Sequence, residues 1–158
     1  MSSISDLRRI LGACKTIAVV GLSPQWHRPS FFAAKYMQAH GYRIVPINPG
    51  ASEILGERSY ASVTEAAQHV AIDMVDCFRK TEDIGPIADE AIAIGAKCLW
   101  QQIGVINTAA AAKAQAAGLD VVMDRCVKIE HARLYGGLGW FGVNTKVISS
   151  KRPQQLPY

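Results

Sequence analysis

The chain has 158 residues, of which 49% are hydrophobic and 19% are charged, and its net charge is +4. This length and composition predict one compact domain with its own core. Because there is no arginine and lysine run and no basic–aromatic stripe, we expect no nucleic acid partner. There is no signal-peptide pattern and no apolar run near the roughly 20 residues of a membrane helix. We therefore expect a cytoplasmic protein with no membrane partner, and leave a homo-oligomer or a protein partner open.

The cysteines and histidines are too scattered to predict a CxxC pair or a zinc site. They are Cys14, Cys77, Cys98 and Cys126, and His27, His40, His69 and His131. We expect free thiols in a reducing compartment and no bound metal.

Apolar strand patterns alternate with helical patterns along the chain. The predicted strands are residues 16–21, 42–47, 72–78, 97–101 and 119–123, and the predicted helices are residues 4–11, 30–40, 81–94 and 107–117, with a short helix after Ser62. Ser62 and Glu65 form a capping-box pattern, and Thr81 and Asn107 are predicted caps. Residues 53–60 are predicted to be irregular.

This alternation predicts parallel strands joined by right-handed crossovers. The strands are nearly continuous valine and isoleucine runs, which is typical of strands covered on both faces. We predict an α/β fold, a Rossmann-like, doubly wound open sheet of about five mainly parallel strands. The domain is predicted to span residues 1–135, with residues 136–158 as a glycine-rich tail that packs on it or extends from it.

The most informative feature is the transition from the first strand to the next helix. The strand ends at Gly21, a short polar loop follows, and the helical pattern begins at Ser30. Free N–H groups at a helix start and the helix dipole attract anions. Ser23, Arg28 and Ser30 add side-chain donors, so this turn predicts a site for a phosphate-bearing ligand.

Two familiar nucleotide sites do not fit this turn. It lacks G-x-G-x-x-G, and Asn48-Pro49 stands where an NAD site has an acidic residue, which disfavours NAD. NADP stays open, because Arg28 or Arg79 could meet a 2′-phosphate. The P-loop pattern G-x-x-x-x-G-K-[ST] is absent.

The chain resembles the small stand-alone CoA-binding proteins, which are similar to the N-terminal CoA-binding domain of the succinyl-CoA synthetase α subunit. The resemblance covers about residues 7–134. The matching stretches are residues 20–23, 28–30, 41–42, 45–49, 54–57, 73–79, 90–97, 100–105 and 121–126.

The resemblance implies coenzyme A as the ligand, at the carboxyl ends of the strands. It places phosphates near the first turn, adenosine near the second strand end, the nucleotide along the third and pantetheine along the fourth. The implied residues are, in that order, Gly21, Ser23, Arg28, Pro29 and Ser30, then Asn48 and Pro49, then Phe78, Arg79 and Lys80, then Gln102 to Gly104. A long amide-bearing arm and several phosphates agree with this mixture of cations, amides and apolar walls.

We expect no autonomous catalysis and no catalytic residue. The related ligases have a second domain with a phosphorylated histidine, for which this chain leaves no room, although a ligase component stays an alternative, as does an NADP-dependent reductase. Cys126 follows the fifth strand beside Arg125 and Lys128, which could favour its thiolate. It is included among the CoA contacts, and a CoA-linked redox sensor that uses it is a further alternative.

Some conspicuous residues are interpreted as structural. Trp26 and Trp100 are expected to be packing residues, and His27 a solvated loop residue. Glu130 and His131 form an acid–base pair only as a minor alternative. Asn48 is expected to make its turn through its own side chain.

Overall fold

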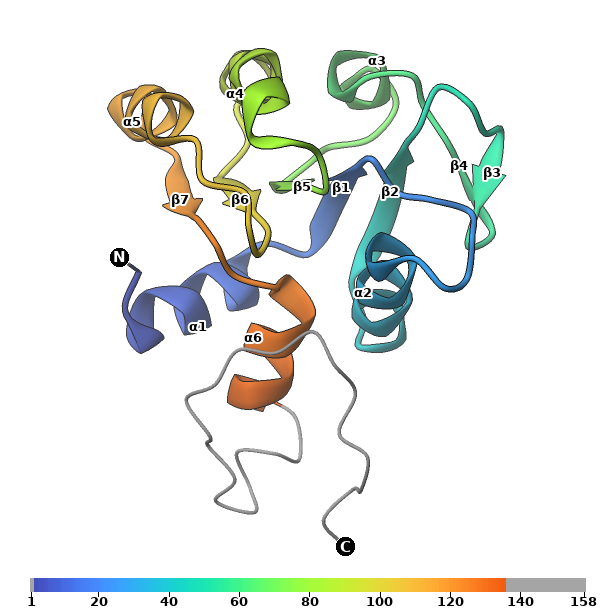
Figure 1. Cartoon of the computed structure of the whole chain (residues 1–158), viewed down its shortest axis with the longest axis horizontal. Coiled ribbons are helices and arrows are strands. Elements are labelled where there is room, and N and C mark those ends of the chain that lie inside the picture. Colours follow the sequence, from blue (N-terminus) through green and yellow to red (C-terminus); the bar gives the residue numbers. More distant parts are fainter. Residues whose placement is uncertain (1, 136–158) are drawn as a thin grey trace, which may run out of the picture.

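A five-stranded parallel sheet is the centre of the computed structural model, which describes residues 2–135 (Figure 1). Its strands are β1 (Thr16–Val20), β2 (Arg43–Ile47), β5 (Met74–Cys77), β6 (Cys98–Gln101) and β7 (Asp120–Val122). Their order is β2-β1-β5-β6-β7, and each neighbouring pair is parallel. The predicted Rossmann-like fold is therefore confirmed. Residues 136–158 lie outside the described residues, so the domain boundary stays a prediction.

Helices cover both faces of the sheet (Figure 1). One face carries α1 (Ile4–Ala13), α2 (Pro29–Ala39) and α6 (Val127–Tyr135), and the other carries α3 (Val63–Ala67), α4 (Ile84–Ala93) and α5 (Thr108–Ala116). Successive strand residues point to opposite faces, so Ile17 joins one core and Ala18 the other. Among the described residues, no helix is long and apolar enough to cross a membrane.

Local capping patterns are largely confirmed. The Asn107 side chain accepts the Ala110 N–H at 2.9 Å and caps α5. The Ser62 hydroxyl accepts the Glu65 N–H at 3.1 Å and caps α3. The Glu65 carboxylate accepts the Ala61 N–H, whereas a capping box would use the Ser62 N–H, one residue later.

Two local predictions are wrong. Residues 53–60, predicted to be irregular, contain an antiparallel hairpin of β3 (Glu53–Ile54) and β4 (Glu57–Arg58). Thr81 does not cap the following helix, since the chain first forms a 3₁₀ turn, η1 (Thr81–Asp83), before α4. The Thr81 hydroxyl instead accepts the Ile106 N–H at 3.3 Å from the loop after β6. The Thr81 hydroxyl, which the local pattern predicts to be a helix cap, thus makes a long-range contact instead.

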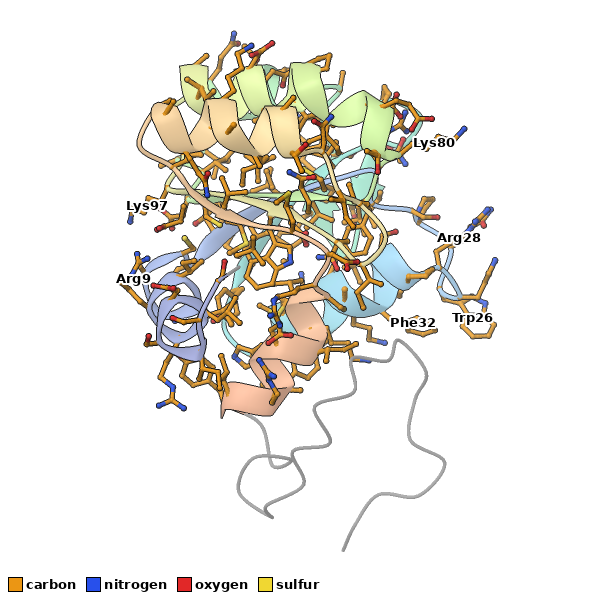
Figure 2. The ribbon with its side chains drawn as sticks, turned by 60° about the vertical axis from the view of Figure 1, so that its left-hand side comes forward. Arg9, Trp26, Arg28, Phe32, Lys80 and Lys97 are labelled. Atoms are coloured by element: carbon orange, nitrogen blue, oxygen red, sulfur yellow. The ribbon has the colours of Figure 1, made fainter. Side chains whose placement is uncertain are left out.

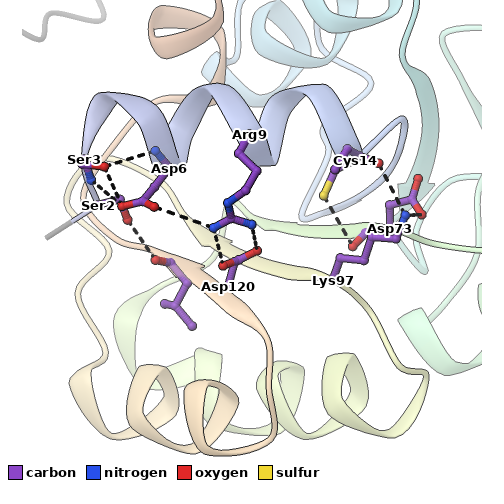
Figure 3. Close-up of polar contacts among 10 residues, drawn as sticks. Ser2, Ser3, Asp6, Arg9, Cys14, Asp73, Lys97 and Asp120 are labelled. Atoms are coloured by element: carbon purple, nitrogen blue, oxygen red, sulfur yellow. Dashed lines mark hydrogen bonds and ion pairs between the residues drawn. The ribbon is translucent and has the colours of Figure 1, made fainter.

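Polar contacts hold α1 against β7, the edge strand of the sheet (Figure 3). The Arg9 guanidinium donates two hydrogen bonds to the Asp120 carboxylate on β7, at 2.8 and 2.9 Å. The Ser2 hydroxyl donates to the Val121 carbonyl at 3.1 Å. The edge strand is therefore covered in part by the first helix, which limits its pairing with other chains.

The turn after β1 passes very close to the turn after β5. Gly21 has φ +83°, and a Cβ built on it would lie 2.4 Å from the Phe78 carbonyl oxygen and 3.0 Å from Arg79 Cδ. Glycine is needed here both for the left-handed backbone and for the close approach.

Gly21→Ala should therefore destabilise the fold more than Gly118→Ala. Gly118 also has positive φ, +94°, but a Cβ there would meet nothing within 4 Å. The control should cost about 1–2 kcal/mol of backbone strain, and Gly21→Ala about 1–3 kcal/mol more for overpacking. Urea unfolding of the two variants measures the difference. Equal losses would contradict the steric account.

An aromatic cluster joins α6 to α2. The His131 imidazole lies among the rings of Tyr36, His40, Tyr42 and Tyr135, at centroid distances of 5.1–5.5 Å. His131 Nδ1 is 3.0 Å from the Tyr36 hydroxyl, and the Tyr135 hydroxyl donates to a carbonyl of α1. Burial lowers the pKa of His131, and the neighbouring His40 and Lys15 lower it further.

The stability that His131 contributes should therefore fall as pH drops below about 6.5. Below that pH the unfolded chain protonates His131 while the folded chain resists, so the unfolded state binds more protons. From pH 7.5 to 5.5, urea stability should change less favourably in the wild type than in His131→Gln, which keeps every other titrating group. His27→Gln, in an exposed loop, is the control and should keep the wild-type difference. Identical pH profiles for wild type and His131→Gln would refute this role.

Candidate functional site

The carboxyl ends of β1 and β5 flank the point where the order of the strands reverses. From β1 the chain goes to β2 on one side and later returns to β5 on the other side. In open α/β sheets, ligands bind in the crevice at such a switch point. The predicted binding residues lie in the segments that follow β1, β2, β5 and β6 at this edge, and Cys126 follows β7. The topology thus brings all the predicted segments to one edge.

The loop between β1 and α2 is folded by its own polar groups. The Ser30 hydroxyl, buried at the start of α2, accepts the Ser23 N–H at 3.0 Å. The Ser23 hydroxyl accepts the Gln25 N–H at 3.1 Å, and Arg28 Nε donates to Gln25 Oε1 at 3.3 Å. No side chain caps the first turn of α2, which starts at Pro29 and holds no acidic residue. Pro29 has no N–H group, and the Phe31 and Phe32 N–H groups bond the Arg28 carbonyl, so among the described residues the Ser30 N–H is the first-turn amide left for an anion.

Asn48 connects the end of β2 to this loop. Its Nδ2 donates to the Leu22 carbonyl at 3.0 Å, and its Oδ1 accepts the Gly50 N–H at 2.8 Å. The second bond confirms that Asn48 makes its own turn. Because both ends of the amide are engaged, Asn48 positions the first loop, while the neighbouring Pro49 is exposed beside it.

Cations gather at this edge (Figure 2). Arg28 and Lys80 lie at one end of the molecule, whereas Arg9 and Lys97 lie at the opposite end. The Arg79 stem packs at the Gly21 turn, next to half-buried Phe78, and its guanidinium pairs with Asp83 at 3.3 Å. The edge is therefore positive beside the start of α2, which suits a ligand with several phosphates.

Two buried side-chain amides and a buried carboxyl lie near the carboxyl end of β6. Gln101 accepts the Asn107 N–H at 2.7 Å and so fixes the start of α5. Gln102 Nε2 donates to Asp76 Oδ1 at 2.5 Å, and both side chains are buried. Burial raises the pKa of Asp76 to about 7. Sequence reasoning missed Asp76 as a site residue, although an acid inside the apolar run of β5 was a usable signal.

Gly104, on the same loop, is tied to the segment after β7. Its N–H donates to Asp124 Oδ1 at 2.8 Å, and Asp124 has φ +56°, a strained conformation for a non-glycine residue. The loops after β6 and β7 therefore form one connected wall.

The surroundings of Cys126 do not favour the thiolate that the redox-sensor alternative requires. Burial is the largest effect and raises its pKa, although the N–H groups of Lys128 and Ile129 and the Lys128 charge act in the opposite direction. Arg125 pairs with Glu130 at 3.2 Å and is therefore engaged elsewhere. The four cysteines are free thiols, as expected.

The remaining expectations concern Glu130 with His131 and the two tryptophans, and their outcomes differ. Glu130 is fully buried between Arg125 and Arg133, while His131 faces the aromatic cluster, so the two do not form an acid–base pair. Trp100 is fully buried and donates to the Arg125 carbonyl at 2.7 Å, which confirms its packing role. Trp26 is 72% exposed in the first loop, so the packing role expected for it is wrong.

An open depression of about 790 Å³ lies elsewhere, along β7. It is lined by Ser2 and residues of α1, by Ile106 of the loop after β6, by Gln115 of α5, and by Leu119, Asp120, Val121, Met123, Asp124 and Arg125. The ion pair of Arg9 with Asp120 lies within this depression, and no residue of the loop after β1 lines it. Its position makes it a poor candidate for the switch-point ligand.

Comparison with known proteins identifies the family. A family model described as "CoA binding domain" matches residues 15–132. Protein YneT of Bacillus subtilis (strain 168) is 38% identical over 130 residues, which cover 82% of this chain and 95% of that protein.

Two solved structures are similar over most of their length. A hypothetical protein from Pyrococcus horikoshii OT3 has a TM-score of 0.82 at 39% identity, covering 85% of this chain and 94% of that one. A Thermus thermophilus protein has a TM-score of 0.78 at 32% identity, covering 85% of this chain and all of that one. Sequence and structure agree, and the chain belongs to the CoA-binding domain family.

Proposed function

We propose that this protein binds coenzyme A or a short acyl-CoA at the carboxyl edge of its sheet, without catalysing a reaction on its own. The observation that carries the proposal is the uncapped start of α2 beside the Gly21 turn, with Arg28 in the same loop. Amides and cations that converge on one turn suit the phosphates of CoA. Family membership supports this choice of ligand.

The rest of the ligand would follow the edge. Adenosine would lie near Asn48 and Pro49, the nucleotide along Phe78 to Lys80, and the pantetheine arm along Gln102 to Gly104. The engaged states of Glu130 and Cys126 support the binding role over a catalytic one, because neither group is free and activated for chemistry.

Arg28→Ala should weaken CoA binding by about 1–3 kcal/mol, the scale of a lost charge-assisted hydrogen bond. Isothermal titration calorimetry measures the change. Arg43→Ala removes an exposed arginine at the amino end of β2, at the opposite edge, and should leave the affinity unchanged. An unchanged affinity in Arg28→Ala would contradict the phosphate assignment. Binding of NADP without binding of CoA would overturn the proposed ligand.

CoA should be held without a covalent bond to Cys126, since burial raises the pKa of that thiol and disfavours its thiolate. In native mass spectrometry, the CoA adduct should survive added reductant, and Cys126→Ser should retain it. A CoA adduct that reductant releases from the peptide containing Cys126 would instead favour the redox-sensor alternative. Cys77→Ser is a control that removes a buried thiol outside the predicted contacts.

A further inference from the structure

The least expected group near the site is the Asp76 carboxyl. It lies on the central strand β5, between Val19 and Trp100 of the neighbouring strands, and is 1% exposed. No ion pair among residues 2–135 includes it; the one group found to bond it is Gln102 Nε2, at 2.5 Å. A buried carboxyl without a cation is costly. Its place beneath the switch point suggests that it serves the site.

The chemistry of the pair fixes its orientation. An ionised carboxylate only accepts hydrogen bonds, so the Gln102 amide must turn its NH₂ group toward Asp76 and its oxygen away. Within the described part of the chain, no donor bonds Gln102 Oε1 or Asp76 Oδ2. Neither oxygen is among the fully enclosed polar atoms without a partner. Both oxygens are therefore unused acceptors near the carboxyl ends of β5 and β6.

We propose that Asp76 is a positioning residue, which holds the Gln102 amide with its oxygen toward the crevice. The site then selects a ligand arm that offers uncharged N–H or O–H donors. This inference rests on the proposed function, and the amide and hydroxyl groups of a pantetheine arm have that chemistry. Phosphates, which only accept hydrogen bonds when ionised, would be directed away from Gln102 and toward the first loop.

Protonation of Asp76 should reverse the direction of its hydrogen bond with Gln102. A protonated carboxyl donates, so the Gln102 oxygen can turn toward it and the NH₂ group toward the ligand. Burial raises the pKa of Asp76 to about 7, which places the change near neutral pH. The other titratable groups that sense this carboxyl are the thiols of Cys77, Cys98 and Cys126, and their pKa values are raised. Those thiols stay neutral while Asp76 titrates.

The first test uses the free protein. The side-chain NH₂ resonances of Gln102, assigned by their loss in Gln102→Leu, should shift between pH 6 and 8 with a midpoint near 7. In Asp76→Asn this shift should vanish. The variant should still fold at pH 8, because it replaces a buried carboxylate by a neutral group of the same shape. Resonances that do not move in the wild type would overturn the positioning role.

The second test separates the arm from the phosphates. Calorimetry compares CoA with adenosine 3′,5′-bisphosphate, which lacks the arm but carries phosphates that titrate near pH 6. Relative to this analogue, CoA affinity should fall up to about tenfold from pH 8 to 6, as the ionised fraction of Asp76 falls. Asp76→Asn should lose that pH dependence, and Gln102→Leu should weaken CoA but not the analogue. Asp73→Asn, at the amino end of β5, is the matched control and should keep the wild-type profile.

The outcomes are distinguishable. A wild-type pH profile in Asp76→Asn, or equal losses for CoA and the analogue in Gln102→Leu, would overturn this inference and leave CoA binding intact. No CoA binding at any pH would overturn the proposed function, while the resonance titration would still decide whether Asp76 orients Gln102.

Discussion

The steric contact between the turns after β1 and β5 is the constraint on which the site depends. A side chain at residue 21 would collide with the Phe78 carbonyl, so only glycine allows the two turns to meet. Their contact brings the Arg79 stem against the Gly21 turn, while its guanidinium pairs with Asp83. The candidate anion-binding loop and the segment that carries Arg79 are more than 50 residues apart in the sequence, and the absence of a Cβ at Gly21 lets them meet.

The polar groups of this edge divide into those that shape it and those that remain available. The side chains of Ser30, Asn48 and Gln101 form hydrogen bonds that fix the loops and helix starts. Arg28 and Lys80 remain exposed, and the first amides of α2 lack a side-chain cap. This division would keep the candidate site ordered before a ligand binds. Preorganised donors lose less entropy on binding than donors that must be ordered by the ligand.

Sequence reasoning succeeded where the signal was local or periodic. The alternation of apolar strands and helices identified the sheet, and the spacing of Asn107 from Ala110 identified a helix cap, because both follow from backbone geometry over a few residues. It failed where distant segments compete for the same group. The Thr81 hydroxyl bonds a loop 25 residues away instead of capping the next helix. Which partner wins depends on tertiary packing, which no local pattern contains.

Helix α6 connects two ionisable regions that the sequence presented as unrelated. Its first residue follows Cys126 at the carboxyl edge, and its later turns hold His131 against α2 and β2. The Arg125–Glu130–Arg133 cluster lies between these ends, so moving either end would expose or separate a fully buried carboxylate. Separating such a pair leaves an uncompensated charge, which costs several kcal/mol. The buried ion pairs therefore tie the start of α6, beside the candidate site, to the turn of the helix that carries His131.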